Sequence, residues 1–350
     1  MGVPFIQQYR IAIYVMGRRL LRKRFYPLVL MLEPLFRCNL ACVGCGKIDY
    51  PEEILDKRLS VSACLSAVEE CGAPVVSIAG GEPLLHEDMP QIVEEIIKRK
   101  KFVYLCTNGL LLKNQINKYE TSPYFTFSVH LDGNRERHDF SVCREGVFDV
   151  AVEGIQYALA QGFRVTINCT LYEGVTAEEM AAFFEFISGL GVEGITLTSG
   201  FSYETVACSE VFLKRTVGKQ LFREIFELGK GRGWKFNHTS LYLDFLAGNQ
   251  TYQCTPWGNP TYNIFGWQRP CYLLNEGYAG TFRELMEETD WDAYGLGRNP
   301  KCANCMLHSG FEATAVIETF DNPLKALMVS LRGPRTNGPM ARDLALDEPS

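Results

Sequence analysis

Two stretches of sequence decide the fold of this chain. The first reads LVLMLEPLFRCNLACVGC over residues 28–45, and the second reads PVVSIAGGEP over residues 74–83. Each begins as a short, nearly continuous apolar run, which is typical of a strand buried on both faces of a parallel sheet. Each then ends in a loop that carries cysteines or glycines. These cysteines and glycines are therefore expected at the ends of two neighbouring strands.

Four more apolar runs follow the same pattern. They predict six strands, over residues 28–33, 74–79, 102–106, 124–131, 164–171 and 194–198. Amphipathic helices separate the strands: Ser60 precedes one helical stripe, Gly72 ends it, and Thr176 with Glu179 forms a capping-box pattern before another. Six strand–helix units predict an α/β fold with a parallel barrel or partial barrel, whose chemistry gathers where the strands end.

Composition excludes several classes of protein. The chain has 350 residues, 47% of them apolar, which excludes a disordered chain. Its 35 basic and 41 acidic residues give a net charge of −6, so we expect no nucleic-acid partner. The positive charges at residues 18–24 follow the short apolar run at 11–16, which is the reverse of a signal peptide. We therefore expect a cytoplasmic protein, in which the clustered members of its 13 cysteines serve metal or redox chemistry.

Three cysteines follow the first predicted strand as Cys38-x3-Cys42-x2-Cys45. A structural zinc site requires a fourth ligand nearby, but the next cysteine, Cys64, lies in a predicted helix stripe with Cys71, where both are expected to be core residues. Three thiolates on an iron–sulfur cluster leave one iron open, as a catalytic cluster requires. The five histidines show no comparable ligand spacing.

Polar residues also follow the later strands. The second strand ends in Gly80-Gly81-Glu82-Pro83 and the third in Thr107-Asn108-Gly109. The fourth runs into Ser128-Val129-His130-Leu131-Asp132-Gly133, and Asn168 interrupts the apolar fifth strand. Polar groups at these positions are expected to orient a polar cofactor, although each alone is also typical of ordinary turn chemistry.

Taken together, these motifs resemble the radical S-adenosylmethionine (radical SAM) superfamily over about residues 28–200. The resemblance implies a partial (β/α)6 barrel in which Cys38, Cys42 and Cys45 hold a 4Fe–4S cluster and S-adenosylmethionine chelates the open iron. It also implies a reductant such as ferredoxin or flavodoxin. The implied cofactor-binding residues around S-adenosylmethionine are Gly80, Gly81, Glu82, Asn108, Ser128, Asp132, Arg144 and Asn168.

Longer stretches, at residues 3–9, 26–51 and 70–83, resemble the radical SAM proteins of hopanoid biosynthesis. That resemblance implies a hydrophobic triterpene substrate and addition of the 5′-deoxyadenosyl radical to its terminal alkene. Such an addition leaves a carbon radical that needs a hydrogen atom. Cys106, at the end of the third predicted strand, is one candidate donor. The alternative interpretation is that Cys106 is a buried thiol of the core. Cys169 is the alternative donor, but it alternates with Asn168 and is expected to face the other way.

Four further cysteines, Cys254, Cys271, Cys302 and Cys305, lie in a segment rich in Gly, Pro and Trp. They predict a small metal-stapled C-terminal domain over residues 236–320, with either a second 4Fe–4S cluster or a zinc ion. The barrel is predicted over 28–235 and a poorly ordered tail over 321–350. Residues 1–27 predict an amphipathic basic helix that either contacts the inner face of the membrane or packs on the barrel.

Two other functions remain open at this point. One is a radical SAM enzyme with an auxiliary cluster that modifies a peptide or protein. The other is a non-enzymatic iron–sulfur or zinc protein, which the Gly80-Gly81-Glu82 motif disfavours.

Overall fold

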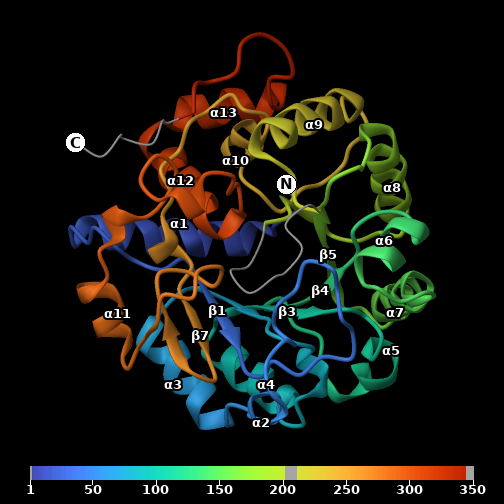
Figure 1. Cartoon of the computed structure of the whole chain (residues 1–350), viewed down its shortest axis with the longest axis vertical. Coiled ribbons are helices and arrows are strands. Elements are labelled where there is room, and N and C mark those ends of the chain that lie inside the picture. Colours follow the sequence, from blue (N-terminus) through green and yellow to red (C-terminus); the bar gives the residue numbers. More distant parts are fainter. Residues whose placement is uncertain (1, 202–210, 344–350) are drawn as a thin grey trace.

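A computed structural model describes residues 2–201 and 211–343, so Cys208 lies outside the described residues. Its strands form one sheet in the order β6-β5-β4-β3-β2-β1-β7-β8-β9 (Figure 1). The first six strands are parallel and match the six predicted ones to within two residues at either end. Their bounds are β1 Val29–Glu33, β2 Val75–Ile78, β3 Phe102–Thr107, β4 Phe125–His130, β5 Arg164–Leu171 and β6 Ile195–Ser199. This is the predicted α/β fold with a parallel barrel sheet.

Helices cover the outside of the parallel strands, and Figure 1 shows α3 to α9 in an arc around them. Ser60 caps α3 by accepting a hydrogen bond from the Ala63 N–H, and Gly72 ends that helix at φ +68°. Thr176 and Glu179 form the predicted capping box at the start of α8. The helices are α1 Phe5–Leu20, α2 Glu52–Leu55, α3 Val61–Cys71, α4 Met89–Lys98, α5 Leu112–Gln115, α6 Arg135–Ser141, α7 Val147–Ala160, α8 Ala177–Gly189, α9 Arg215–Leu228, α10 Ser240–Leu246, α11 Phe282–Glu288, α12 His308–Asp321 and α13 Pro323–Arg332.

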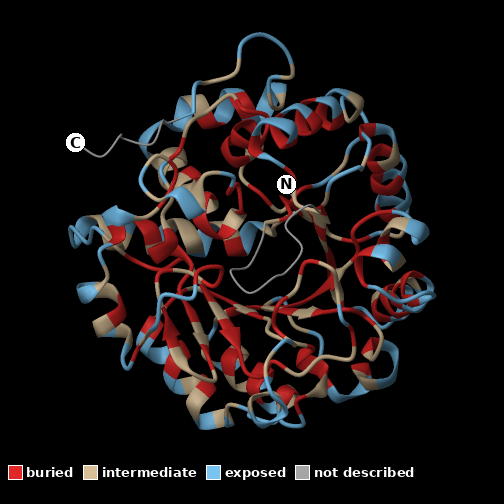
Figure 2. Cartoon of the chain, viewed as in Figure 1, coloured by how far each residue is buried: buried red, intermediate tan, exposed pale blue. Residues whose placement is uncertain are grey.

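The two faces of the barrel strands differ in chemistry. Outward residues such as Leu30, Ile78 and Phe127 are fully buried under the helices (Figure 2). Inward residues such as Ser77 and Asn168 are polar and half-buried, because they face an internal cavity. The strands are therefore buried on both sides, as predicted, but only the outward side is a conventional apolar core.

The C-terminal region extends the same sheet. Strand β7 (Thr261–Asn263) pairs in parallel with β1, and β8 (Gly266–Gln268) and β9 (Tyr278–Ala279) extend it as antiparallel strands. Beyond it, residues 323–332 form α13 where a poorly ordered tail was predicted. Helix α13 packs on α10 and α12, because Ala326 and Val329 supply a buried apolar side.

Helix α1 lies at the end of the barrel where the strands begin. Arg10 donates to the carbonyl of Lys100, just before β3, and the Gly2 N–H donates to Phe236, which bridges to Ile195 at the start of β6. Val15 is fully buried, so one side of α1 packs on the barrel. This is the second of the two alternatives given for residues 1–27. Within the described residues, no helix is both long and apolar enough to cross a bilayer.

The capping box of α8 gives a first prediction. Thr176→Ala removes the oxygen that accepts from the Glu179 N–H, so we expect it to lower the free energy of unfolding by about 1 kcal/mol. Thr176→Ser keeps that oxygen and should change it little. Urea unfolding monitored by circular dichroism measures both, and equal losses in the two variants would rule out the capping contribution.

Candidate functional site

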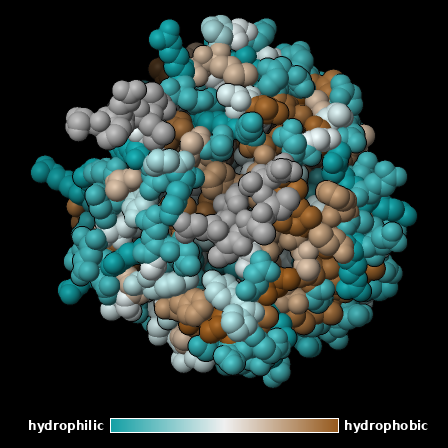
Figure 3. All heavy atoms as spheres, viewed as in Figure 1, coloured by the Kyte–Doolittle hydropathy of each residue, from teal (hydrophilic) through white to brown (hydrophobic). Residues whose placement is uncertain are grey.

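A cavity of about 840 Å³ occupies the inside of the barrel. It is lined by residues of all six parallel strands, by the loop that carries Cys38, Cys42 and Cys45, and by α1, α12 and α13. The face of the molecule seen in Figure 3 is hydrophilic at its rim, with hydrophobic side chains towards its middle. Because β1 to β6 are parallel, their carboxyl ends bring the predicted polar residues to one end of this cavity.

The loop after β1 presents its three thiols to the cavity. Cys38, Cys42 and Cys45 are half-buried and free. Burial raises the pKa of all three, to about 11 for Cys38, because a thiolate without a cation is costly away from water. The backbone N–H groups of Leu40 and Lys47 point at the sulfurs of Cys38 and Cys45.

The spacing of these thiols distinguishes between kinds of metal site. Thiolates around a zinc ion lie about 3.8 Å apart, since each Zn–S bond is about 2.3 Å. In the part of the chain that the structure describes, no three cysteine sulfurs lie within 4.8 Å of one another. In this arrangement the three thiols therefore do not enclose a single zinc ion.

The two glycines of the Gly80-Gly81-Glu82 turn permit a close backbone approach. A Cβ on Gly81 would lie 2.1 Å from the carbonyl oxygen of Arg37, and one on Gly80 would lie 2.3 Å from that of Leu35. The turn also donates from the Gly81 N–H to Leu35 and from the Glu82 N–H to Arg37. The glycines thus admit the cysteine loop, and both also line the cavity. Their contact with S-adenosylmethionine stays a prediction.

Glu82 joins this turn to the one after β3. Its carboxylate accepts from the Leu84 N–H at 3.0 Å, from the Thr107 hydroxyl at 2.9 Å and from the Asn108 N–H at 2.8 Å. Burial raises its pKa to about 7 despite these three donors. Glu82 lines the cavity, but three of the hydrogen bonds that its carboxylate can accept are already made within the protein. A contact with the amine of S-adenosylmethionine would use the remaining oxygen lone pair.

Asn108 reaches the cysteine loop directly. Its side-chain N–H donates to the Asn39 amide oxygen at 2.7 Å and lies 3.9 Å from the Cys38 sulfur. The loops after β1, β2 and β3 are therefore tied together by Glu82 and Asn108, as expected for polar residues at adjacent strand ends.

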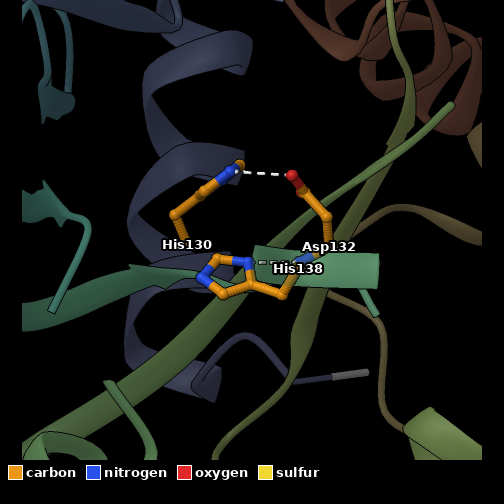
Figure 4. A group of neighbouring side chains, drawn as sticks. All are labelled: His130, Asp132 and His138. Carbon is orange, nitrogen blue, oxygen red and sulfur yellow. Dashed lines mark hydrogen bonds and ion pairs between the residues drawn. The ribbon is translucent and has the colours of Figure 1, made fainter. Parts of the chain in front are cut away.

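Figure 4 shows a group formed by His130, Asp132 and His138, of which Asp132 and His138 are buried and His130 is half-buried. Asp132 accepts from Ser141 and from the Thr170 N–H, and its Oδ2 lies 2.9 Å from His130 Nε2. Burial opposes a charge on His130, but the charge and hydrogen bond of Asp132 outweigh it and raise its pKa. Spacing along the chain did not reveal this group, because the turn between β4 and α6 brings His138 back beside Asp132.

Asp132 is committed to this network, whereas Ser128, His130 and Asn168 line the cavity. Arg144 is exposed, follows α6 in the chain and is absent from the described cavity lining. The reason is that α6 fills the space after β4, so the chain reaches Arg144 only at the surface. Its predicted contact with a cofactor carboxylate remains a prediction.

Cys106 faces the cavity from β3. Its sulfur lies 3.5 Å from the Ser77 hydroxyl on β2, and Ser128 on β4 hydrogen-bonds to it from the other side. Burial raises its pKa, so it stays a protonated thiol at neutral pH. Cys169 is fully buried and is not part of the described lining, as its alternation with Asn168 predicted.

Two residues near the cysteine loop were missed by the sequence analysis. Lys47 forms a buried ion pair with Glu33 at 2.8 Å and stacks on Phe36. Tyr172 follows β5, lines the cavity and lies within 2.8 Å of where a Cβ on Gly44 would be. A lysine two residues after the third cysteine and a tyrosine directly after a strand were the available signals.

The C-terminal cysteines also come together. Burial raises the pKa of Cys254 well above its usual value, and charges on Cys305, Cys271 and Cys302 would raise it further, so all four thiols are neighbours. Backbone N–H groups of Leu273 and Leu307 point at the sulfurs of Cys271 and Cys305. Residues next to these cysteines, such as Tyr272 and Leu307, line the cavity.

Comparison with protein families gives two matches. Residues 32–187 match the family described as the radical SAM superfamily, and residues 195–329 match a domain of unknown function, DUF3463. The second match begins at β6 and includes the four C-terminal cysteines.

Similar curated proteins include a probable GTP 3′,8-cyclase of Methanocella arvoryzae, 29% identical over 200 residues, which are 54% of this chain and 64% of that protein. The GTP 3′,8-cyclase of Aquifex aeolicus is 31% identical over 183 residues, 49% of this chain and 57% of that protein. An Fe-coproporphyrin III synthase of Methanosarcina barkeri is 28% identical over 140 residues, 39% of this chain and 35% of that protein. The chain thus spans about half the length of the curated relatives it matches.

Solved structures share the fold. Streptococcus suis SuiB superposes with a TM-score of 0.63 at 16% identity, over 86% of this chain and 76% of that chain. The anSMEcpe protein with bound AdoMet and Cp18Cys peptide gives 0.59 at 17% identity, over 87% and 99%.

The glycine turn gives a prediction for the cysteine loop. Gly81→Ala places a Cβ against the carbonyls of Phe36 and Arg37, so we expect overpacking of roughly 1–3 kcal/mol and a loss of iron and labile sulfide after reconstitution. Gly189→Ala, at an open position in α8, is the control and should keep the metal content. Equal iron content in both variants would show that this backbone contact does not position the thiols.

Proposed function

We propose that the protein adds the 5′-deoxyadenosyl group of S-adenosylmethionine to the terminal alkene of hopene (diploptene), giving adenosylhopane. The match of residues 32–187 to the radical SAM superfamily supports this chemistry. The observation that carries this proposal is the cavity, which runs from the three thiols through the barrel and has the Cys106 thiol on its wall. The resemblance of residues 3–9, 26–51 and 70–83 to radical SAM proteins of hopanoid biosynthesis supports it.

Cys38, Cys42 and Cys45 would hold the 4Fe–4S cluster, with the backbone around Gly80–Gly81 and the polar ends of β4 and β5 around S-adenosylmethionine. When bound, the two supply a 5′-deoxyadenosyl radical after one electron arrives from a reductant such as ferredoxin or flavodoxin. The chain holds the cysteine loop through Glu82 and Asn108 and surrounds the reacting atoms with protein, which excludes water.

The reaction also needs a hydrogen atom. A new carbon–carbon bond at the terminal CH₂ of a 1,1-disubstituted alkene leaves one unpaired electron on the tertiary carbon. Cys106 carries an S–H bond into the cavity and would donate its hydrogen atom there, forming the C–H bond and leaving a thiyl. One further electron and one proton restore the thiol, so the overall conversion releases methionine and consumes two electrons and one proton.

The cavity lining argues against a nucleotide triphosphate, the substrate class named for the GTP 3′,8-cyclase relatives. Among the described lining residues there is no arginine or lysine, the side chains that usually neutralise phosphates. Glu33, Glu82 and Glu312 are the charged lining residues apart from histidines. A neutral polycyclic hydrocarbon needs no such cations, so the lining favours it.

The first experiment is an anaerobic assay of the reconstituted protein with S-adenosylmethionine, dithionite and either diploptene or GTP, read by mass spectrometry. We expect an adduct of adenosyl and hopene with diploptene and none with GTP. Formation of 5′-deoxyadenosine without an adduct would leave the radical SAM chemistry but reject hopene. A peptide-modifying enzyme would give this second result with both substrates.

Removal of the Cys106 thiol tests the hydrogen donor. We expect Cys106→Ala to keep forming 5′-deoxyadenosine but to lower the yield of adenosylhopane by roughly tenfold or more, with radical by-products in its place. Cys169→Ala removes a thiol from outside the cavity and should keep the yield. Unchanged yield in Cys106→Ala would reject this role.

We further propose that Cys254, Cys271, Cys302 and Cys305 hold a second 4Fe–4S cluster. No three of the described cysteine sulfurs lie within 4.8 Å of one another, which is wider than the spacing around one zinc ion and favours the larger group. A Cβ on Gly310 would lie 2.7 Å from the Cys254 sulfur, so glycine leaves room beside this thiol. A cluster there would stabilise the loops that wall the cavity.

Metal analysis separates these alternatives. We expect about eight iron atoms per chain, falling to about four in Cys302→Ser. Cys143→Ser, which changes an exposed thiol outside both groups, should keep the full content. One zinc ion per chain that Cys302→Ser removes, with iron unchanged at about four, would contradict the second cluster.

A further inference from the structure

The exposed apolar surface of this protein is concentrated on two helices. Eleven of the sixteen exposed large apolar side chains among the described residues belong to α1 with Leu21 and to α13. Leu20, Phe5 and Leu331 are each at least 80% exposed. The eleven side chains are Phe5, Ile6, Tyr9, Ile13, Met16, Leu20 and Leu21 in the first segment and Leu324, Leu327, Met328 and Leu331 in the second. Patches of this kind mark contact with a partner or a membrane.

The two segments that carry these helices contain charge of one sign only, although Lys325 pairs with Glu318 of α12. Residues 1–32 contain six basic residues and no acidic one, and residues 322–342 contain four basic residues and no acidic one, in a chain whose net charge is −6. Arg19 and Arg24 pair with Asp321 and Asp292. Arg22 and Lys23 are exposed beside the apolar Leu20 and Leu21. This combination is complementary to anionic lipid headgroups above an apolar interior.

The two segments lie close together. Arg19 of α1 donates to the carbonyl of Ile317 and to the carboxylate of Asp321, at the end of α12, and stacks on Phe320. Helix α13 begins two residues after Asp321 and packs on α12. The apolar residues of α1 and α13 therefore flank one region of the surface.

The cavity of the barrel reaches this region. Phe5 and Tyr9 line the cavity and are also 81% and 55% exposed, so they lie where it meets solvent. Phe320 of α12 and Ala326 of α13 line the same cavity. Helix α1 lies at the end where the strands begin, whereas the cysteine loop follows the other end of β1. The cavity thus connects the cysteine loop with the apolar surface at the opposite end of the barrel.

We propose that α1 and α13 dock this protein on an anionic phospholipid bilayer, and that the cavity mouth beside Phe5 and Tyr9 admits a hydrocarbon substrate from the bilayer. The docking stands on the apolar surface and its charge, and the admission of a triterpene rests on the proposed function. A substrate that entered here would have its alkene end near the cysteine loop and the rest of its hydrocarbon skeleton towards the lipid.

Vesicle flotation tests the docking without S-adenosylmethionine or hopene. We expect the reconstituted protein to float with phosphatidylcholine vesicles that contain phosphatidylglycerol and to bind pure phosphatidylcholine vesicles weakly. Leu20→Gln/Leu331→Gln should lower the bound fraction about tenfold, since two apolar anchors are lost. Arg22→Gln/Lys23→Gln should reduce the preference for the anionic vesicles. Val150→Gln/Val217→Gln alters two exposed apolar residues elsewhere and should bind like the wild type.

Unchanged binding in Leu20→Gln/Leu331→Gln, or equal binding to neutral and anionic vesicles, would overturn the docking proposal. A wild-type dimer that Leu20→Gln/Leu331→Gln turns into a monomer, with no flotation of either, would assign the surface to a second copy of the chain and overturn it as well.

Activity then tests the admission of substrate. We expect Leu20→Gln/Leu331→Gln to convert detergent-dispersed diploptene at the wild-type rate and vesicle-embedded diploptene at least several-fold more slowly. Equal rates from vesicles would overturn substrate admission at this surface. Flotation without any adduct would reject hopene as substrate while leaving the docking in place, so the two failures are distinguishable.

Discussion

The close approach of two backbones at the end of β1 and β2 is the constraint on which the rest of this site depends. Gly80 and Gly81 let the turn after β2 lie against the carbonyls of residues 35–37, where any side chain would collide. That contact fixes where the cysteine loop leaves the sheet. Glu82 then ties the same turn to the loop after β3, so three adjacent strand ends move as one unit.

The barrel is built to leave space inside. Fully buried apolar residues face outward to the helices and carry the packing, while the inward positions hold small or polar side chains such as Ser77, Ser128 and Thr198. Small inward residues leave the cavity open, and its described lining contains glutamates but no arginine or lysine. Cys106 sits between two hydroxyl groups in this wall, where burial keeps its sulfur protonated.

The C-terminal region completes the same structure. Strand β7 pairs with β1, and residues next to Cys271 and Cys305 line the cavity, so a cofactor at the four cysteines would stiffen the wall of the substrate space. Helices α1 and α13 flank the cavity at the far end, each with one buried and one exposed apolar side. The three thiols of the cysteine loop and the exposed apolar surface thus lie at opposite ends of the barrel.

The sequence by itself determined the six parallel strands, the caps of α3 and α8 and the placement of Cys38, Cys42, Cys45, Asn108 and Cys106 at strand ends, because strand period, turn residues and capping are local properties. Only the tertiary structure decided that the glycines face the cysteine loop, that His138 returns to Asp132, and that Arg144 stays at the surface. It also decided that Lys47 pairs with Glu33 inside the protein, and that residues 323–332 form a helix. These outcomes depend on contacts between residues far apart in the chain, and local pattern carries no information about which distant segments will meet.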